Sequence, residues 1–337
     1  LPLAEADTLG TGRRADWYQS WLTSNQPGDP YWGPDREHRD RIGQITAPTL
    51  LIGGWHDVLL LGQLDDYAAM RAAGRNPYLT VGPWLHVSTD MFAEAVRESL
   101  VWFRAHLTGD HTTLRTQPVR LYLQGAQQWR VYPEWPPPAS SPQTWYPQSG
   151  YGLAPTPPGN GADRFRYDPA DPTPTVGGPL LDPRTGGRRD NTELEARPDV
   201  LTYTSTMLHD PLDVIGPVSA TVQLRTSTGH TDVFVRLCDV DASGRSTNVC
   251  DGLQRITPET FPAGPDGTHT VPVRLWPTAY RFQPGHRLRL QISGGSFPRF
   301  ARNTGTGEPL GQATRLTPTD LEIRHTTTIT LPIHPPA

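Results

Sequence analysis

Two short stretches of the chain decide the fold that the sequence predicts: PTLLIGGWHD at residues 48–57 and PYLTVGPWLH at residues 77–86. Each contains a continuous apolar run that ends in glycine, which is typical of a buried parallel β-strand. Residues 60–73 and 89–107 follow these runs and carry apolar side chains at helical spacing. This β-α-β-α order predicts parallel strands joined by right-handed crossovers.

Both predicted helices are amphipathic. The apolar positions of the first helix are Leu60, Leu64, Tyr67, Ala68 and Ala72, and those of the second are Phe92, Val96, Leu100, Phe103 and Leu107. An apolar stripe of this kind usually faces the core of a protein. Gly74 follows the first helix as a stop signal.

An acid and a histidine follow the two predicted strands at the same distance. Asp57 comes four residues after Gly53, and His86 comes four residues after Gly82. The carboxyl ends of parallel strands lie at one edge of a sheet, so the two side chains could be near neighbours. Their order matches the second half of a Ser-Asp-His triad in an α/β-hydrolase. In such a triad the acid orients the histidine, and the histidine transfers the proton.

Each of these residues also has a simpler interpretation. Asp57 could cap the helix that follows it, and His86 could be an ordinary, partly buried histidine. The matched positions and the chain order favour the catalytic interpretation. We expect His56, beside Asp57, to lie at the surface or in a pocket wall, because neighbouring side chains on an extended loop point apart.

The nucleophile of such a triad is missing from the sequence. An α/β-hydrolase places its serine in a G-x-S-x-G turn upstream of the acid, and no such motif occurs in the 337 residues. Ser219 lacks the second glycine of the motif, and Ser88 is predicted to be a helix cap. The oxyanion donors that accompany a nucleophile are absent as well. We therefore expect this chain alone to show no triad chemistry.

From about residue 118 the pattern changes to alternating apolar and polar side chains. The alternation is clearest at residues 119–123, 220–224, 271–275 and 287–292, and it predicts an antiparallel β-sandwich. Residues 133–200 are rich in proline and glycine and are predicted to form long surface loops. A further hairpin is predicted around residues 233–250.

The predicted hairpin contains both cysteines of the chain. Cys238 and Cys250 lie on either side of the predicted turn and could face each other. The sequence leaves two alternatives open, a disulfide bridge or a pair of partly buried thiols. Two cysteines so close in sequence do not form a zinc-site pattern.

Composition limits the classes of function. A net charge of −4, with arginines scattered among 34 acidic residues, argues against nucleic acid as a partner. No apolar stretch approaches the roughly 20 residues that a membrane span requires.

The first residue is leucine, so we expect that it is not the translation start. A cytoplasmic location is favoured, and secretion stays open.

Together the motifs resemble those of the cocaine esterase and X-prolyl dipeptidyl-peptidase family of α/β-hydrolases. The resemblance rests on the acid and histidine motifs at residues 53–57 and 81–86 and on residues 102–109, 197–203, 231–235 and 297–303. It extends from about residue 15 to residue 333. One departure is Arg104, at a position where the family usually has an aspartate.

The resemblance implies a fold class of α/β plus all-β. It assigns residues 1–45 to the end of a helical cap, 46–115 to the C-terminal part of an α/β-hydrolase domain, and 116–337 to an antiparallel jelly-roll β-sandwich. It also implies hydrolysis of an ester or amide bond through an acyl-serine, without a metal or an organic cofactor.

The same resemblance assigns roles to four residues. Asp57 and His86 align with the catalytic acid and base of the family. Trp55 and Leu59 flank the acid and could line the acyl pocket, although packing alone explains them equally well.

Members of this family carry their nucleophile on an N-terminal part that the sequence does not contain. We therefore expect a partner that supplies the serine, either a separate chain or another segment, and a small ester, amide or peptide substrate. Two other functions stay open. One is a non-catalytic β-domain that binds carbohydrate or protein, and the other is acyl transfer to an alcohol or amine through the same acyl-enzyme. A homo-oligomer also stays open.

Overall fold

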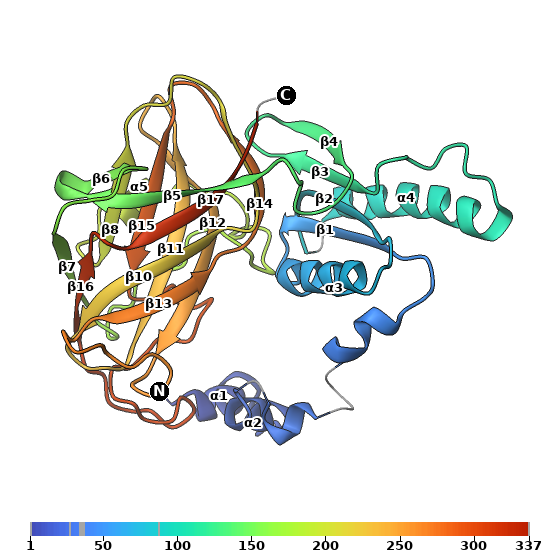
Figure 1. The fold of residues 1–337 in the computed structure, drawn as a ribbon. Helices are drawn as coiled ribbons and strands as arrows, with labels where there is room; N and C mark the ends of the chain where they lie inside the picture. The colour runs from blue at the N-terminus through green and yellow to red at the C-terminus, as the bar shows by residue number, and fades with distance from the viewer. Residues whose placement is uncertain (1, 27, 34–37, 87, 336–337) are drawn as a thin grey trace.

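The protein has three consecutive parts in the computed structural model, which describes residues 2–26, 28–33, 38–86 and 88–335 (Figure 1). A helical N-terminal segment is followed by a small α/β sheet and then by a large β-domain. The N-terminal segment comprises η1 (Leu3–Glu5), α1 (Ala6–Thr11), α2 (Asp16–Thr23), η2 (Pro30–Trp32) and η3 (Arg39–Gln44), where η denotes a 3-10 helix.

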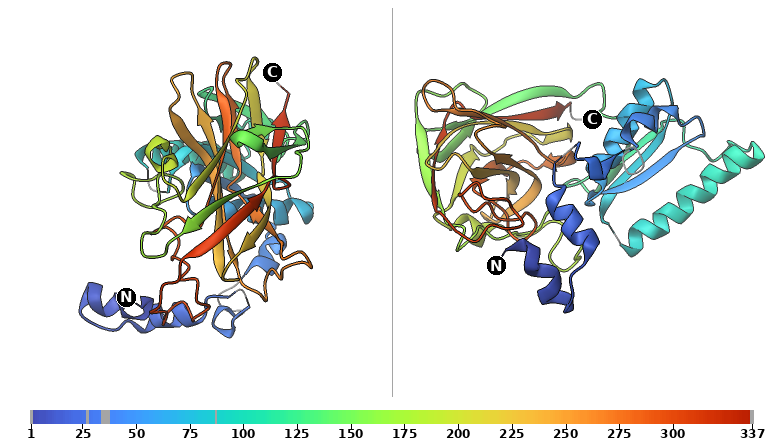
Figure 2. Two further views of the ribbon diagram at one scale, coloured as in Figure 1. Left: turned by 90° about the vertical axis from the view of Figure 1, so that its left-hand side faces the viewer. Right: turned by 90° about the horizontal axis from the view of Figure 1, so that it is seen from below.

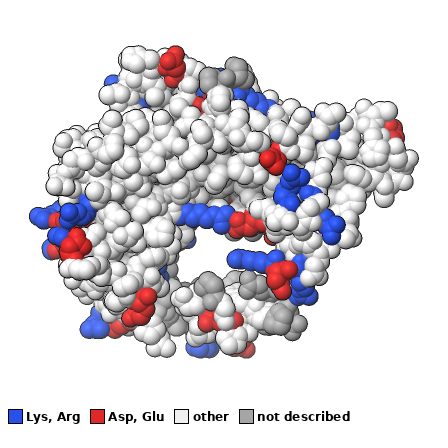
Figure 3. Space-filling view, viewed as in Figure 1, with Lys and Arg blue, Asp and Glu red and all other residues white. Residues whose placement is uncertain are grey.

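The N-terminal segment bridges the other two parts. Near its start, the Ala4 N–H donates to the Gly311 carbonyl of the β-domain over 2.9 Å. At its end, η3 packs against helix α3 of the α/β sheet. Figure 3 shows an opening between the three parts. The N-terminal segment therefore connects the β-domain to the α/β sheet along one side of this opening.

The α/β sheet contains both sequence motifs. Its elements are β1 (Leu50–His56), α3 (Leu60–Ala72), β2 (Tyr78–Leu85), α4 (Thr89–Thr108), β3 (Val119–Leu123) and β4 (Gln128–Tyr132). The strand order is β1-β2-β3-β4, with β1, β2 and β3 parallel and β4 antiparallel to β3. The predicted β-α-β-α order is thus confirmed. Because β1 and β2 are parallel neighbours, the residues that follow them emerge at the same edge of the sheet.

This sheet extends beyond the predicted domain boundary at residue 116. A strand does form at residues 119–123, but its assignment to the β-domain is wrong, because Val119 of β3 pairs with Leu79 of β2. Residues on one face of β3 are buried and those on the other are only partly buried. A parallel strand with one half-exposed face alternates in sequence just as an antiparallel strand does, so the pattern could not distinguish them.

Gly54 allows the ends of β1 and β2 to approach each other closely. The register of the two strands shifts between Gly54 and His56. A Cβ atom at Gly54 would lie 2.2 Å from the carbonyl oxygen of Trp84, which is a backbone atom of the neighbouring strand. Only glycine therefore fits where the two motif-bearing strands end.

We expect Gly54→Ala to lower the free energy of unfolding by about 1–3 kcal/mol, the usual cost of forcing a methyl group into a packed site. Denaturant unfolding of the wild type and the variant measures this loss. Gly62→Ala is the matched control, because Gly62 lies within α3 and a Cβ there would meet nothing within 4 Å. Alanine in an open helix position should be neutral or stabilising. Equal effects at the two positions would contradict the role given to Gly54.

Helix α4 turns its apolar stripe away from the sheet. Phe92, Val96, Leu100, Phe103 and Leu107, which we call the α4 apolar face, are 56% to 78% exposed. The helix extends away from the rest of the molecule in Figure 1, and no described part of the chain covers this face. The periodicity therefore predicted the helix correctly, but the usual expectation that its stripe faces the core does not hold within this chain.

The opposite side of α4 contacts the sheet through charged and aromatic groups. Glu94 and Trp102 are buried on this side. Arg120 of β3 pairs with both Glu94 and Glu98 of the helix, and Arg115 pairs with Glu98.

A helix that could span a membrane is not found among the described residues.

The β-domain is a two-layered β-sandwich joined to the α/β sheet, as the views of Figure 2 show. Its elements are β5 (Ser141–Gln148), β6 (Gly152–Ala154), β7 (Ala162–Tyr167), α5 (Thr192–Glu195), β8 (Val200–Ser205), β9 (Leu212–Gly216), β10 (Ser219–Thr226), β11 (Thr231–Val240), β12 (Ser246–Ile256), β13 (His269–Arg274), β14 (Thr278–Phe282), β15 (Arg287–Ser293), β16 (Thr319–Arg324) and β17 (Thr328–His334); a further 3-10 turn, η4 (Ser149–Tyr151), follows β5. The strands pair antiparallel, except for the short parallel pair of β6 and β8.

Alternating side chains of the two layers meet in one apolar core. One layer is built around β10, β16 and β17, and the other around β11, β12 and β15. The core between them contains Val222 and Leu224 from the first layer and Leu237 and Leu290 from the second. The predicted strands at 220–224, 271–275 and 287–292 are confirmed as β10, β13 and β15.

Two sequence expectations about the β-domain need correction. Residues 133–200 are not only loops, because β5, β6 and β7 lie within them. The many prolines of this region favoured loops in the sequence analysis, so these short strands were not predicted. The predicted hairpin exists as β11 and β12, and of the two alternatives for its cysteines the structure has the unbridged thiols, both of them buried. A register shift after Leu237 places Cys250 opposite Leu237 and Cys238 opposite Asn248, so the two thiols do not face each other.

Candidate active site

Asp57 and His86 meet at the shared edge of β1 and β2. The Nδ1 atom of His86 lies 3.0 Å from Oδ1 and 3.2 Å from Oδ2 of Asp57. The Asp57 carboxylate is buried, whereas one third of the His86 side chain is exposed. The structure thus brings together the two residues that the sequence paired, with the acid inside and the imidazole reaching outward.

The loop after β1 fixes the Asp57 backbone and carboxylate. The Asp57 N–H donates to the Gly54 carbonyl, and the Asp57 carbonyl accepts from the Leu60 N–H. Oδ1 accepts from the Leu59 N–H over 2.8 Å. The carboxylate therefore also takes up a backbone donor at the start of α3. Asp57 is not the helix cap itself, because the N-cap residue of α3 is Leu59 and no side chain caps this helix.

His86 presents its second ring nitrogen away from the acid. With Nδ1 donating to Asp57, Nε2 is the nitrogen that can accept a proton. Nε2 forms no hydrogen bond with any residue that the structure describes. Ser88 is a helix cap, as predicted, because its hydroxyl accepts from the Met91 N–H at the start of α4. The cap fixes the start of α4 two residues after His86.

His56 points the other way and is buried, so the interpretation that it lies at the surface is wrong. Its Nε2 lies 3.0 Å from Oε1 of Gln124, at the end of β3. Burial, as the main cause, lowers the pKa of His56 to about 4, although the hydrogen bond to Gln124 opposes this. His56 is therefore neutral at neutral pH and links β1 to the residue after β3.

Trp55 and Leu59 lie in opposite environments. Trp55 is buried in the core of the α/β sheet, and its indole N–H donates to the Tyr122 carbonyl over 2.8 Å. Leu59, two residues beyond the acid, is 60% exposed. Packing thus accounts fully for Trp55, whereas no packing within the described residues accounts for Leu59.

Two residues at this site had no signal in the sequence. Gln124 holds His56, and Trp276 of the β-domain donates its indole N–H to the Asp57 carbonyl over 3.2 Å. Trp276 is separated from Asp57 by 219 positions, and no periodicity or motif links residues so far apart. Within the described part of the chain, no group of three or more His, Cys, Asp or Glu side chains is arranged to hold a metal ion.

Two family models match the chain. Residues 111–332 match the X-Pro dipeptidyl-peptidase C-terminal non-catalytic domain, and residues 3–88 match the X-Pro dipeptidyl-peptidase of the S15 family. The second match includes both Asp57 and His86. The first covers most of the chain and extends from before β3 into β17.

Relatives and solved structures agree with the family models. Cocaine esterase from Rhodococcus sp. (strain MB1 Bresler) is 32% identical over 91% of this chain, which spans 58% of the length of that relative. The structure of an alpha-amino acid ester hydrolase superposes with a TM-score of 0.87 at 23% identity, covering 99% of this chain and 63% of the other.

An archaeal aminopeptidase, from a marine sediment Thaumarchaeota archaeon, superposes with a TM-score of 0.85 at 21% identity over 99% of this chain and 62% of its own. At such identities these two structures establish the fold alone, an α/β-hydrolase-like sheet followed by a β-domain. The proteins that resemble this chain include hydrolases. The chain belongs to the cocaine esterase and X-Pro dipeptidyl-peptidase family of α/β-hydrolases.

Proposed function

We propose that this chain supplies the acid and the base of a serine hydrolase that cleaves ester or amide bonds through an acyl-serine intermediate. The observation that carries the proposal is the contact between Asp57 and His86 Nδ1 at 3.0 Å, with Nε2 directed away from the acid. This is the arrangement that a Ser-Asp-His triad requires of its second and third members.

In the proposed reaction, His86 moves the proton and Asp57 orients His86. Nε2 takes the proton of the serine hydroxyl as the serine oxygen attacks the carbonyl carbon of the substrate, and then gives it to the departing alcohol or amine. Water attacks the acyl-serine in the second half, and its proton passes through Nε2 back to the serine oxygen. The buried Asp57 carboxylate holds the tautomer with the proton on Nδ1 and stabilises the imidazolium.

We place the nucleophile outside residues 1–337, on a partner part of the complete enzyme. The sequence has no G-x-S-x-G turn, and the chain spans 58% of the length of cocaine esterase. Two surfaces of the α/β sheet support a partner part of this kind.

The α4 apolar face is exposed, and β1 is an edge strand that pairs only with β2 in the described sheet. A partner strand beside β1 would pair with the free backbone N–H and C=O groups of that edge strand. A partner surface against α4 would bury the α4 apolar face.

The substrate is proposed from the relatives and from Leu59. The name of cocaine esterase favours a small ester, and the names of the two family models favour a peptide, so the proposed substrate is a small ester or amide. The exposed Leu59 beside the acid is proposed to contact the acyl group. Trp55, which is buried in the core of the α/β sheet, is proposed to contribute only by fixing the end of β1. We also propose that the β-sandwich is a jelly roll, since strands distant in sequence, such as β7 and β16, are neighbours in it.

The direct test is turnover of an activated ester by the complete protein carrying His86→Ala. We expect a loss of more than a thousandfold, as for other enzymes that lose a triad member. Undiminished turnover would exclude His86 as the base.

A further inference from the structure

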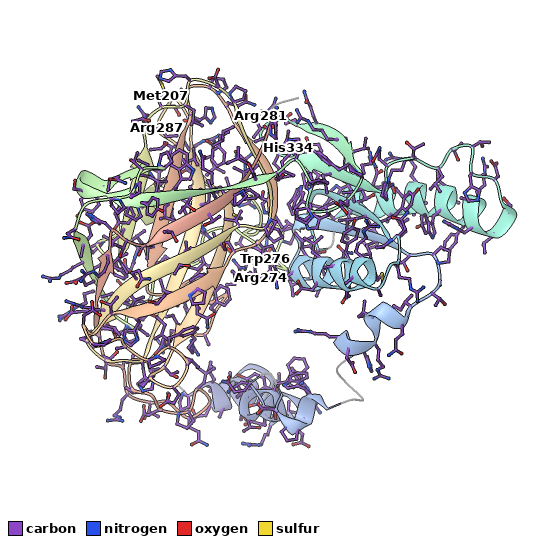
Figure 4. All side chains as sticks on the ribbon, viewed as in Figure 1. Met207, Arg274, Trp276, Arg281, Arg287 and His334 are labelled. Carbon is purple, nitrogen blue, oxygen red and sulfur yellow. The ribbon has the colours of Figure 1, made fainter. Side chains whose placement is uncertain are left out.

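The loop that carries the acid is held from two sides, and one of them is the β-domain. From its own loop, Asp57 has backbone hydrogen bonds with Gly54 and Leu60 and a side-chain bond from the Leu59 N–H. From the other side, the Trp276 indole N–H donates to the Asp57 carbonyl over 3.2 Å. Figure 4 shows Trp276 at the junction of the β-domain and the α/β sheet, beside α3.

Trp276 is itself fixed between the two domains. Its ring packs against the core of the β-domain and against the core of the α/β sheet. Its backbone N–H donates to the Asp251 carbonyl over 2.8 Å. The guanidinium of Arg299 lies over the ring, 4.9 Å from its centroid. The indole N–H is thus aimed at Asp57 by contacts on its ring and on its backbone.

A buried ion cluster supports Trp276 from behind. Asp251 pairs with Arg299 at 2.5 Å and with Arg236 at 2.9 Å, and the side chains of Asp251 and Arg236 are fully buried. Burial would raise the pKa of Asp251, but the two guanidiniums hold that pKa below its ordinary value. Breaking such a buried pair is costly, so the cluster gives the ring of Trp276 a rigid support.

We infer that Trp276 is a positioning residue for the catalytic acid, so that the β-domain takes part in setting the triad geometry. The matching family model describes this domain as non-catalytic. Without the indole donor, the Asp57 carbonyl keeps only the Leu60 N–H, and the loop can shift the carboxylate relative to His86 Nδ1. Small displacements of an orienting group lower the rate of the chemical step much more than they affect substrate binding. This inference rests on the proposed function.

The chain offers a matched control at the same junction. Arg274, at the end of β13, pairs with Asp65 of α3 at 2.5 Å, and both side chains are at least half exposed. Figure 4 places Arg274 beside Trp276. The pair joins the same two domains without touching Asp57, and an exposed ion pair contributes little to stability. Arg274→Gln therefore removes a link between the domains but leaves the acid loop unchanged.

The experiment compares Trp276→Phe with Arg274→Gln in the complete protein, with an activated ester as substrate. Phenylalanine keeps an aromatic ring below Arg299, but it loses both the N–H donor and part of the indole's volume. We expect kcat to fall about threefold to tenfold for Trp276→Phe, corresponding to one lost hydrogen bond, with KM within about twofold. Arg274→Gln should keep both constants within about twofold. Replacement of Trp276 by 3-benzothienylalanine, which exchanges the N–H for sulfur at nearly the same shape, isolates the hydrogen bond and gives the same comparison if phenylalanine impairs folding.

A double-mutant cycle separates positioning from packing. In an Asp57→Ala background, Trp276→Phe should cause no further loss, because its effect passes through Asp57. An equal loss in both backgrounds, a change in KM as large as that in kcat, or an unchanged kcat would each overturn the inference. His86→Ala is measured in the same assay. If that variant retains full activity, the proposed function itself fails, whereas its inactivity together with an unaffected Trp276→Phe refutes only the role of Trp276.

Discussion

His86→Ala is expected to lower kcat/KM for an activated ester by up to about 10⁶ in the complete protein, since loss of a triad histidine removes both the general base and the general acid. The residual rate should come from binding and from oxyanion donors on the partner part. KM should change little, because the imidazole moves a proton and does not hold the substrate. Steady-state kinetics with a chromogenic acetate ester measures both constants.

His209→Ala is the control for this variant. His209 is exposed in the connection between β8 and β9, far along the chain from either motif. Its removal should leave kcat/KM within about twofold, since surface substitutions away from special features have small effects. A comparable loss in the two variants would point to damage of the fold and would contradict the specific role of His86.

Phe103→Asp is expected to destabilise the complete protein by about 3 kcal/mol or more. Phe103 belongs to the α4 apolar face and is exposed within this chain. If the partner part covers that face, the substitution removes a buried aromatic group and introduces a desolvated charge. In this chain alone, the same change should be nearly neutral, because aspartate there meets water. Denaturant unfolding of both forms measures the difference.

Arg104→Ala is the matched control for the α4 apolar face. It changes the net charge by the same single unit as Phe103→Asp, at the neighbouring helix position, which is also exposed. We expect Arg104→Ala to have little effect in either form of the protein. If Phe103→Asp were as harmless in the complete protein as in this chain, the α4 apolar face would not be the surface that the partner part covers.

The local parts of the fold could be predicted because they depend on local sequence. The apolar runs ending in Gly53 and Gly82 predict β1 and β2, and helical spacing predicts α3 and α4. The side that faces the core could not be predicted for α4. Spacing tells which residues share a face, whereas the side that is covered depends on what packs there. Here Glu94 and Trp102 face the sheet, and the α4 apolar face does not.

Pairing between strands was harder to predict than the strands themselves. The sequence showed the alternation of side chains in β3, but it did not show that β3 pairs with β2. Cys238 and Cys250 looked opposed across a hairpin, and a one-residue register shift separated them. In both cases the sequence carries the period of the side chains but not the register, which the surrounding packing decides.

The contact between the acid and the histidine followed from chain order, and their surroundings did not. Parallel strands place the residues after β1 and β2 at one edge, so the Asp57–His86 contact could be expected. The contact with the β-domain could not be expected from the sequence. Trp276 lies beside Asp57 because the cores of the two domains pack against each other there. Gln124 and His56 form a similar contact, invisible to any pattern, between the ends of β1 and β3.

The most direct test of the central claim is to label the complete protein with a serine-directed phosphonate and locate the label by peptide mass mapping. A phosphonate of this kind reacts with a serine that an adjacent histidine has activated. We predict one label, on a serine outside residues 1–337, and its loss when His86 is replaced by alanine. A label on a serine of this chain, such as Ser88 or Ser219, would contradict the account, as would labelling that persists without His86.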